Sequence, residues 1–137
     1  MTPADLHAAT LNRLHGLTTI NVHDSEVPAN PAADNRGRVY PYAVLWPVPG
    51  NTPEAARNLE HDPAGGLVWD ARVTVASGDP TWTLQAVALI RGRLEGWHIR
   101  PGSLLAEVDL GGVAVQKDDG TTAPARWYVP LQFRTTL

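Results

Sequence analysis

The chain has no cysteine among its 137 residues. Disulfides, thiolate metal sites and cysteine nucleophiles are therefore excluded, and the composition fits assembly in a reducing compartment. Long apolar runs are also missing, because the longest nearly apolar stretch, residues 86–90, is far shorter than the roughly 20 residues of a membrane-spanning helix. The first residues show no cationic region followed by an apolar run. We therefore expect neither a signal peptide nor a membrane-spanning segment.

An excess of basic residues is absent too. Eleven Lys and Arg residues against 14 Asp and Glu residues give a formal net charge of −3, which argues against a protein whose main task is to bind nucleic acid tightly. The length suits one domain, residues 1–137, and 43% hydrophobic residues supply enough apolar material for one core. With 12 glycines and 12 prolines, we expect long ordered loops between the packed elements.

Two helices are predicted from their start and stop signals. The first has Thr2 as its N-cap and ends at Gly16, and the second has Asp79 as its N-cap and ends at Gly96. In both, a proline directly follows the cap, where the missing N–H costs nothing. Apolar residues recur in each at steps of three or four, so we expect each helix to pack one face on a sheet.

Alternating or β-branched runs predict six strands, at residues 18–23, 39–48, 67–76, 104–110, 113–117 and 126–135. Pro41 and Pro47 cannot donate ladder hydrogen bonds, which places the second strand at a sheet edge or ends it early. Residues 24–38 and 49–66 are rich in polar residues, Pro and Gly and are expected to be loops. Neighbouring strands joined by short turns favour a single α+β domain with a mostly antiparallel sheet, two helices packed on one side and long loops.

Motifs of known catalytic sites are missing from the sequence: there is no G-x-S-x-G, no glycine-rich phosphate loop and no H-E-x-x-H. Folding could bring His23 and Asp24 together with His61 and Asp62 as a metal or acid–base set. However, a loop histidine beside a loop aspartate is ordinary in a solvated turn. We therefore expect no enzyme activity, no catalytic residues, no cofactor and no metal site.

Aromatic and basic residues favour a subunit interface instead. A nucleic-acid surface could form from basic residues interleaved with aromatic ones: Arg91, Arg93 and Arg100 with Trp97 and His98. However, cations are common at helix ends and the net charge is negative. Trp46 and Trp97 are expected to be partly exposed, and tryptophan is enriched at interfaces. Long loops also serve as arms that reach neighbouring molecules. Our candidate interface residues are Trp46, Trp97, Arg91 and Arg93.

Several segments, in this order, resemble the tail-terminator proteins of long-tailed bacteriophages and related prophages. They are the initial helix, residues 19–23 (TINVH), 27–28 (VP), 40–45 (YPYAVL), 84–97 (LQAVALIRGRLEGW) and 126–133 (RWYVPLQF). In that family a proline-aromatic strand, a helix ending in a small-residue turn and a final aromatic strand recur in this order on a small α+β fold. The resemblance covers most of the chain.

The resemblance implies a structural virion protein of the tail neck, assembled in the host cytoplasm. It implies a homo-oligomeric ring, usually of six subunits, that stops polymerisation of the major tail tube protein and joins the tail to the head-side connector or stopper protein. DNA would pass through the lumen without specific binding. Such capping needs no catalysis, because a heterologous interface that closes on itself limits growth.

Two other functions remain open from the residues alone. One is a head-closure or other neck protein of similar size, which would be distinguished by whether the tail-tube protein or the portal-side adaptor co-purifies with it. A small enzyme or ligand-binding α+β domain would need polar side chains that converge in a pocket.

Overall fold

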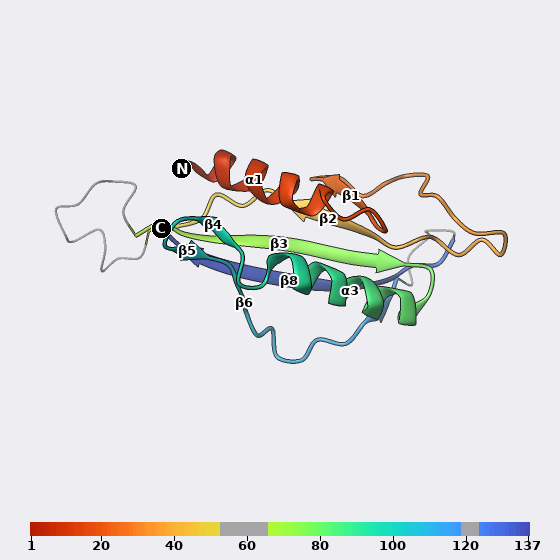
Figure 1. Cartoon of the computed structure of the whole chain (residues 1–137). Helices are drawn as coiled ribbons and strands as arrows, with labels where there is room; N and C mark the ends of the chain where they lie inside the picture. Colours follow the sequence, from red (N-terminus) through yellow and green to blue (C-terminus); the bar gives the residue numbers. More distant parts are fainter. Residues whose placement is uncertain (53–65, 119–123) are drawn as a thin grey trace.

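Two helices and eight strands make up the described part of the chain. The computed structural model describes residues 1–52, 66–118 and 124–137 (Figure 1). In chain order, the elements are α1 (Pro3–His15), β1 (Asn21–Asp24), β2 (Tyr42–Trp46), β3 (Val68–Ser77), α3 (Pro80–Leu94), β4 (His98–Arg100), β5 (Ser103–Leu104), β6 (Ala106–Glu107), β7 (Gln116–Lys117) and β8 (Trp127–Thr136). Most of the expected 49–66 loop lies outside the described residues, as does most of the expected turn at 118–120.

Both helices begin where the sequence predicts. The Thr2 hydroxyl accepts the backbone N–H of Asp5, and the Asp5 carboxylate accepts the backbone N–H of Thr2, which completes a capping box for α1. The Asp79 carboxylate accepts the backbone N–H groups of Thr81 and Trp82 at the start of α3. These side chains satisfy donors that a helix leaves free in its first turn.

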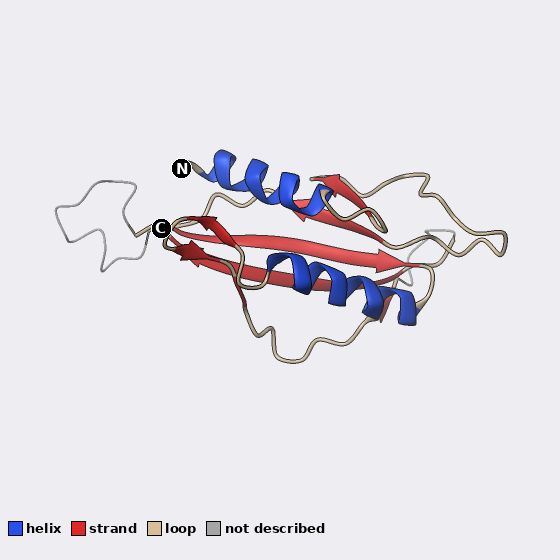
Figure 2. Cartoon of the chain, viewed as in Figure 1, coloured by secondary structure: helices blue, strands red, loops and turns tan. Residues whose placement is uncertain are grey.

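The main sheet has the strand order β1-β2-β3-β8-β6, and β7 also pairs with β8 (Figure 2). The longest pairing joins β3 and β8, which run antiparallel from Val68 opposite Thr136 to Ser77 opposite Trp127. Strands β4 and β5 form a separate small hairpin. Together with the two helices, this is the expected α+β fold with a mostly antiparallel sheet.

One hydrophobic core lies between the helices and one face of the sheet. Both helices pack on this same face, as predicted (Figure 2). The alternation predicted for β3 and β8 is confirmed, because side chains on one face of each strand are buried. The buried core residues include Leu6, Leu14, Ile90 and Leu94 from the helices, Trp69, Ala71, Val73 and Val75 from β3, and Val129, Leu131 and Phe133 from β8.

Of the two expectations for the proline-flanked strand, the early end is confirmed and the edge position is not. β2 lies between β1 and β3, and its residues from Tyr42 to Leu45 are buried. The strand ends early: Pro41 precedes it and Pro47 follows it, so neither proline occupies a position that must donate to the ladder. β1 runs parallel to β2, because the long connection 25–41 returns the chain to the same end of the sheet before β2 begins.

The strands expected at 104–110 and 113–117 are much shorter than predicted. β6 pairs with β8 up to Glu107, and the N–H of Val108 donates to the carbonyl oxygen of Gln132. Backbone polar groups alternate in direction along a strand, so Pro130 faces the same edge as Gln132. Proline has no N–H, and the ladder stops there until β7 resumes it opposite Tyr128.

A small second cluster lies on the sheet face away from the helices. It contains Val39, Tyr42, Val44 and Ala76. Arg126, expected on the solvent side of the last strand, is buried at the edge of this cluster, and its Nη1 donates to the Tyr42 hydroxyl at 3.1 Å. The aromatic hydroxyl gives the buried guanidinium a polar partner that the alternation pattern did not indicate.

Gly78 and Gly92 provide a matched test of this packing. A Cβ at Gly78 would lie 2.4 Å from the backbone nitrogen of Val39, whereas a Cβ at Gly92 within α3 meets nothing within 4 Å. We expect Gly78→Ala to lower the free energy of unfolding by about 1–3 kcal/mol through overpacking. Gly92→Ala should raise it by up to about 1 kcal/mol through helix propensity. Urea denaturation measures both, and equal stability of the two variants would contradict the packing.

Candidate assembly interface

His23 and Asp24, the first pair of the candidate metal or acid–base set, do not face a common site. The His23 ring packs edge-on against Tyr42, with 5.9 Å between ring centroids. The Asp24 carboxylate instead lies 2.6 Å from His7 Nε2 and accepts a hydrogen bond from the Ser25 hydroxyl at 2.7 Å. The Ser25 hydrogen bond, followed by that of His7, lowers the pKa of Asp24 below its ordinary value. The Ser25 hydroxyl therefore donates to the same carboxylate that contacts His7.

The second pair, His61 and Asp62, lies outside the described residues. Within residues 1–52, 66–118 and 124–137, no three His, Asp or Glu side chains gather in a way that could hold a metal ion.

The two candidate interface tryptophans lie on opposite sides of the sheet. Trp46 belongs to the face away from the helices, and its Nε1 donates to the Thr74 hydroxyl at 2.9 Å. Trp97 packs against the main core on the helix side, with the Arg13 guanidinium 5.4 Å from its ring centroid. Each is half-buried and contacts its own chain, so a charge at either position would disturb the fold as well as any interface.

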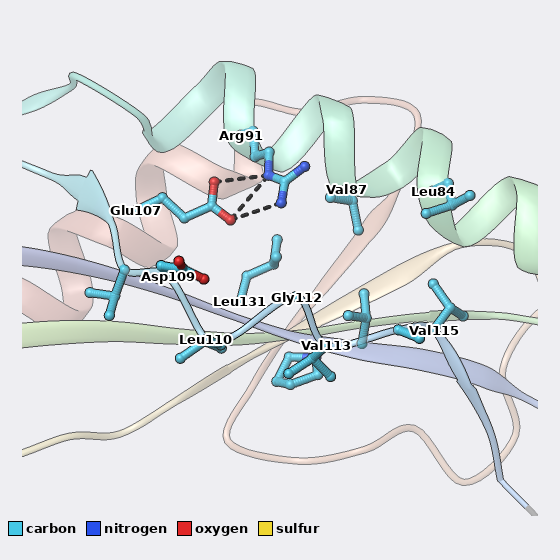
Figure 3. A pocket seen from close by; sticks show the side chains of 14 residues that line it. Leu84, Val87, Arg91, Glu107, Asp109, Leu110, Gly112, Val113, Val115 and Leu131 are labelled. Atoms are coloured by element: carbon cyan, nitrogen blue, oxygen red, sulfur yellow. Dashed lines mark hydrogen bonds and ion pairs between the residues drawn. The ribbon is translucent and has the colours of Figure 1, made fainter.

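The two candidate arginines also have intramolecular partners. Arg93 Nε donates to the Arg13 carbonyl oxygen at 2.8 Å, and Arg13 Nε donates to the Arg93 carbonyl oxygen at 3.0 Å. This reciprocal pair satisfies carbonyls in the last turns of both helices. Arg91 forms an ion pair with Glu107, with Nε 2.8 Å from the carboxylate (Figure 3). Of the four candidates, Arg91 alone lines the apolar groove described next.

An apolar groove of about 500 Å³ lies between α3, residues 108–115 and β8 (Figure 3). We call residues 108–115 the edge segment and this cavity the edge groove. Val87 and Leu131 contribute to its lining, and its rim exposes Leu84 to 58%, Leu110 to 37% and Val113 to 41%. Exposed apolar patches of this kind mark binding surfaces more often than single exposed side chains do.

The missing ladder at Pro130 explains why the edge groove exists. β6 and β7 hold the edge segment to β8 at its two ends, while between them the segment leaves the strand. Because Pro130 lines the groove and has no N–H, the exposed edge of β8 is poorly suited to pair with an added strand. A partner in the groove must therefore be held mainly by side-chain contacts.

One end of the edge groove is polar and carries an acidic group. Beside the Arg91–Glu107 ion pair lies Asp109, whose carboxylate accepts the backbone N–H of Gly111 at 2.8 Å. Gly111 has a φ of +82°, which suits the tight turn that this carboxylate stabilises. In the described part of the chain, Asp109 has no cationic partner.

A second exposed feature is the arm, residues 25–40, which joins β1 to β2 and projects beyond the end of the sheet (Figure 1). Its base is fixed to α3, because Tyr40 stacks on Trp82 with 6.2 Å between ring centroids and the Arg38 guanidinium lies 4.4 Å from the Trp82 ring. The exposed side chains of the arm include Val27, Tyr40 and the tip residue Arg36.

The tip of the arm is ordered by Asp34. Its carboxylate accepts the backbone N–H groups of Arg36 and Arg38, at 3.0 and 2.8 Å, and the Arg38 Nε at 2.9 Å. Desolvation opposes ionisation of this carboxyl, but the hydrogen bonds from Arg38 and Arg36 and the charge of Arg38 outweigh it and lower the pKa of Asp34. The arm is thus a preformed projection, as an Asx turn allows.

One residue of the α3 sequence indicates the edge groove. Leu84 is apolar and exposed, and it lies off the helical stripe of α3 that includes Val87 and Ile90. Leucines outside the core stripe of an amphipathic helix indicate a second, exposed apolar surface. The contribution of the edge segment depends on its position beside β8, which required the tertiary structure.

No known protein-family model matches the chain, and no curated protein matches its sequence. Among the described residues, neither helix combines the length and apolarity needed to cross a bilayer. The function is therefore inferred from the chain's own residues.

The ordering role of Asp34 predicts a pH dependence of the arm. Its carboxylate form is favoured in the folded protein, so its contribution is complete above the ordinary pKa of 3.8 and is lost as the pH falls through the lower folded value. We expect hydrogen exchange of the Arg38 amide to accelerate in that acidic range. In Asp34→Asn, which has no charge to lose, this transition should vanish; its persistence would contradict the role of Asp34.

Proposed function

We propose that this protein is a tail-terminator subunit of a long-tailed bacteriophage. It forms a ring that caps the tail tube, stops its polymerisation and joins the tail to the head-side connector. The observation that carries this proposal is the presence of two unlike exposed surfaces, the edge groove and the arm, on one small domain.

Two unlike surfaces suit a ring. A two-fold dimer uses the same patch on both subunits, whereas a ring uses two different patches that bind each other head to tail. When the rotation from one subunit to the next divides the circle, the contact closes and no free patch remains. A closed ring that offers the tube only one binding face ends tube growth without any chemical step.

The sequence resemblance covers both the packed elements and part of the exposed surface. The resembling segments include β1, β2, α3 and β8, which pack around the shared core. Exposed apolar residues lie both within the resembling segments, as Val27 and Leu84 do, and on the edge segment, as Val113 does.

The charges of the chain suit a lumen through which DNA slides. The net charge is −3. Ion pairs within the chain join Arg38 to Asp34, Arg91 to Glu107 and Arg134 to Asp70. Cations paired in this way release fewer counterions on meeting phosphates, so they bind DNA less tightly than free ones.

Electron microscopy of phage particles made without this protein tests the proposal. We expect overlong tails without heads, because nothing stops tube polymerisation or joins the tube to the head. Complementation with the wild-type gene is the control and should restore tails of uniform length.

Two other outcomes would count against the proposal. DNA-filled or leaking heads beside separate tails of normal length would identify a head-closure or other neck protein. Normal particles would remove the protein from the neck and favour the enzyme or ligand-binding alternative.

A pair of leucines on α3 provides a test of the edge groove. Leu84 lines the groove and Leu89 does not, yet both are exposed, at 58% and 41%. A glutamate at either site should change stability by less than about 0.5 kcal/mol. Only Leu84→Glu should reduce capping, measured as tail length and as co-purification with the tail tube protein, because it places a charge in the apolar groove. Equal effects of the two variants would contradict a role of the groove.

A further inference from the structure

The edge groove and the arm have complementary chemistry. The groove has apolar walls and a polar end at which Asp109 has no cationic partner among the described residues. The arm presents apolar Val27, and at its tip the Arg36 guanidinium makes no hydrogen bond or ion pair within the described chain. The arm therefore supplies a cation, Arg36, for the Asp109 carboxylate of the groove.

We infer that the arm tip of one copy docks into the edge groove of the neighbouring copy, with Arg36 facing Asp109. This inference rests on the proposed ring, since it names the head-to-tail contact that would close it. The occupant of the groove is a second copy of this chain.

The order within the arm favours this contact energetically. Asp34 already holds the backbone of the tip through the N–H groups of Arg36 and Arg38, and the base is stacked on Trp82. Docking a preformed segment costs less conformational entropy than ordering a flexible one. Because Pro130 prevents regular strand addition, a compact turn with projecting side chains suits the groove better than an extended peptide does.

The two features also point in different directions. The arm projects beyond the end of the sheet, whereas the edge segment bulges from the side of β8 (Figure 1). Stacking of Tyr40 on Trp82 holds the base of the arm in place. The tip is therefore presented to a neighbouring copy, as a heterologous contact requires.

Disulfide cross-linking tests this contact directly, because the chain contains no cysteine of its own. Asn35→Cys places a thiol at the arm tip, and Val113→Cys places one in the edge groove. After mild oxidation of assembled tails carrying the double variant, we expect a ladder of disulfide-linked multimers on a non-reducing gel. Each single variant should give no species larger than a dimer.

A matched control pairs Val113→Cys with Asn12→Cys, at an exposed position on α1, which is not part of the arm. This pair should give no ladder, and a ladder as strong as that of the test pair would overturn the contact. Tails of normal length that contain the double variant but show no ladder would also overturn it. That last result would leave the proposed function intact, because capping itself would be unchanged.

The charge component has its own variants. In the cysteine background, Arg36→Glu places a carboxylate opposite Asp109 and should lower the ladder yield by about two- to fivefold, as expected for an exposed charge pair. Asp109→Asn removes this repulsion but keeps an oxygen that accepts the Gly111 N–H, so adding it should restore the yield. A yield that Arg36→Glu leaves unchanged would overturn the pairing of these two residues.

Discussion

The pairing of β3 with β8 is the constraint on which the rest of the structure depends. The strands are in register from Val68 opposite Thr136 to Ser77 opposite Trp127. Because side chains alternate between the faces of a strand, a shift of one residue would move Trp69 and Phe133 from the core to the solvent. The same register turns the backbone of Pro130 toward the side of β8 that pairs with β6 and β7. Because proline has no N–H, the ladder is interrupted there, and the edge groove forms at this interruption.

Arginine contacts show how the chain combines a stable fold with exposed binding surfaces. Arg13 and Arg93 join the two helix ends through each other's carbonyl oxygens, so these charges serve the fold. Arg91 pairs with Glu107 across the end of the edge groove and helps to hold β6 near α3. Arg36 has no such partner in the described chain, which makes it available to another molecule. Residues of one type thus have different roles, decided by what lies within reach of each side chain.

The proposed assembly mechanism requires rigidity at both contact surfaces. Gly78 allows the base of the arm to approach the end of β3, since any side chain there would collide with Val39. Asp34 orders the tip, and β6 and β7 fix both ends of the edge segment. Surfaces that are already ordered lose little entropy on association, and this allows a small interface to be specific. In the proposed ring, such subunits would end tube growth through geometry alone.

Local patterns were sufficient to predict the helix starts at Thr2 and Asp79, the core faces of β3 and β8, and the α+β class, because caps and alternation involve residues close in sequence. Contacts between distant segments decided the interior place of β2, the parallel direction of β1 and the intramolecular roles of Trp97 and Arg93. They also decided the edge groove, which exists only where α3, β8 and residues 108–115 meet. A linear pattern indicates that a side chain is apolar or charged, but its partner is known only once the chain has folded.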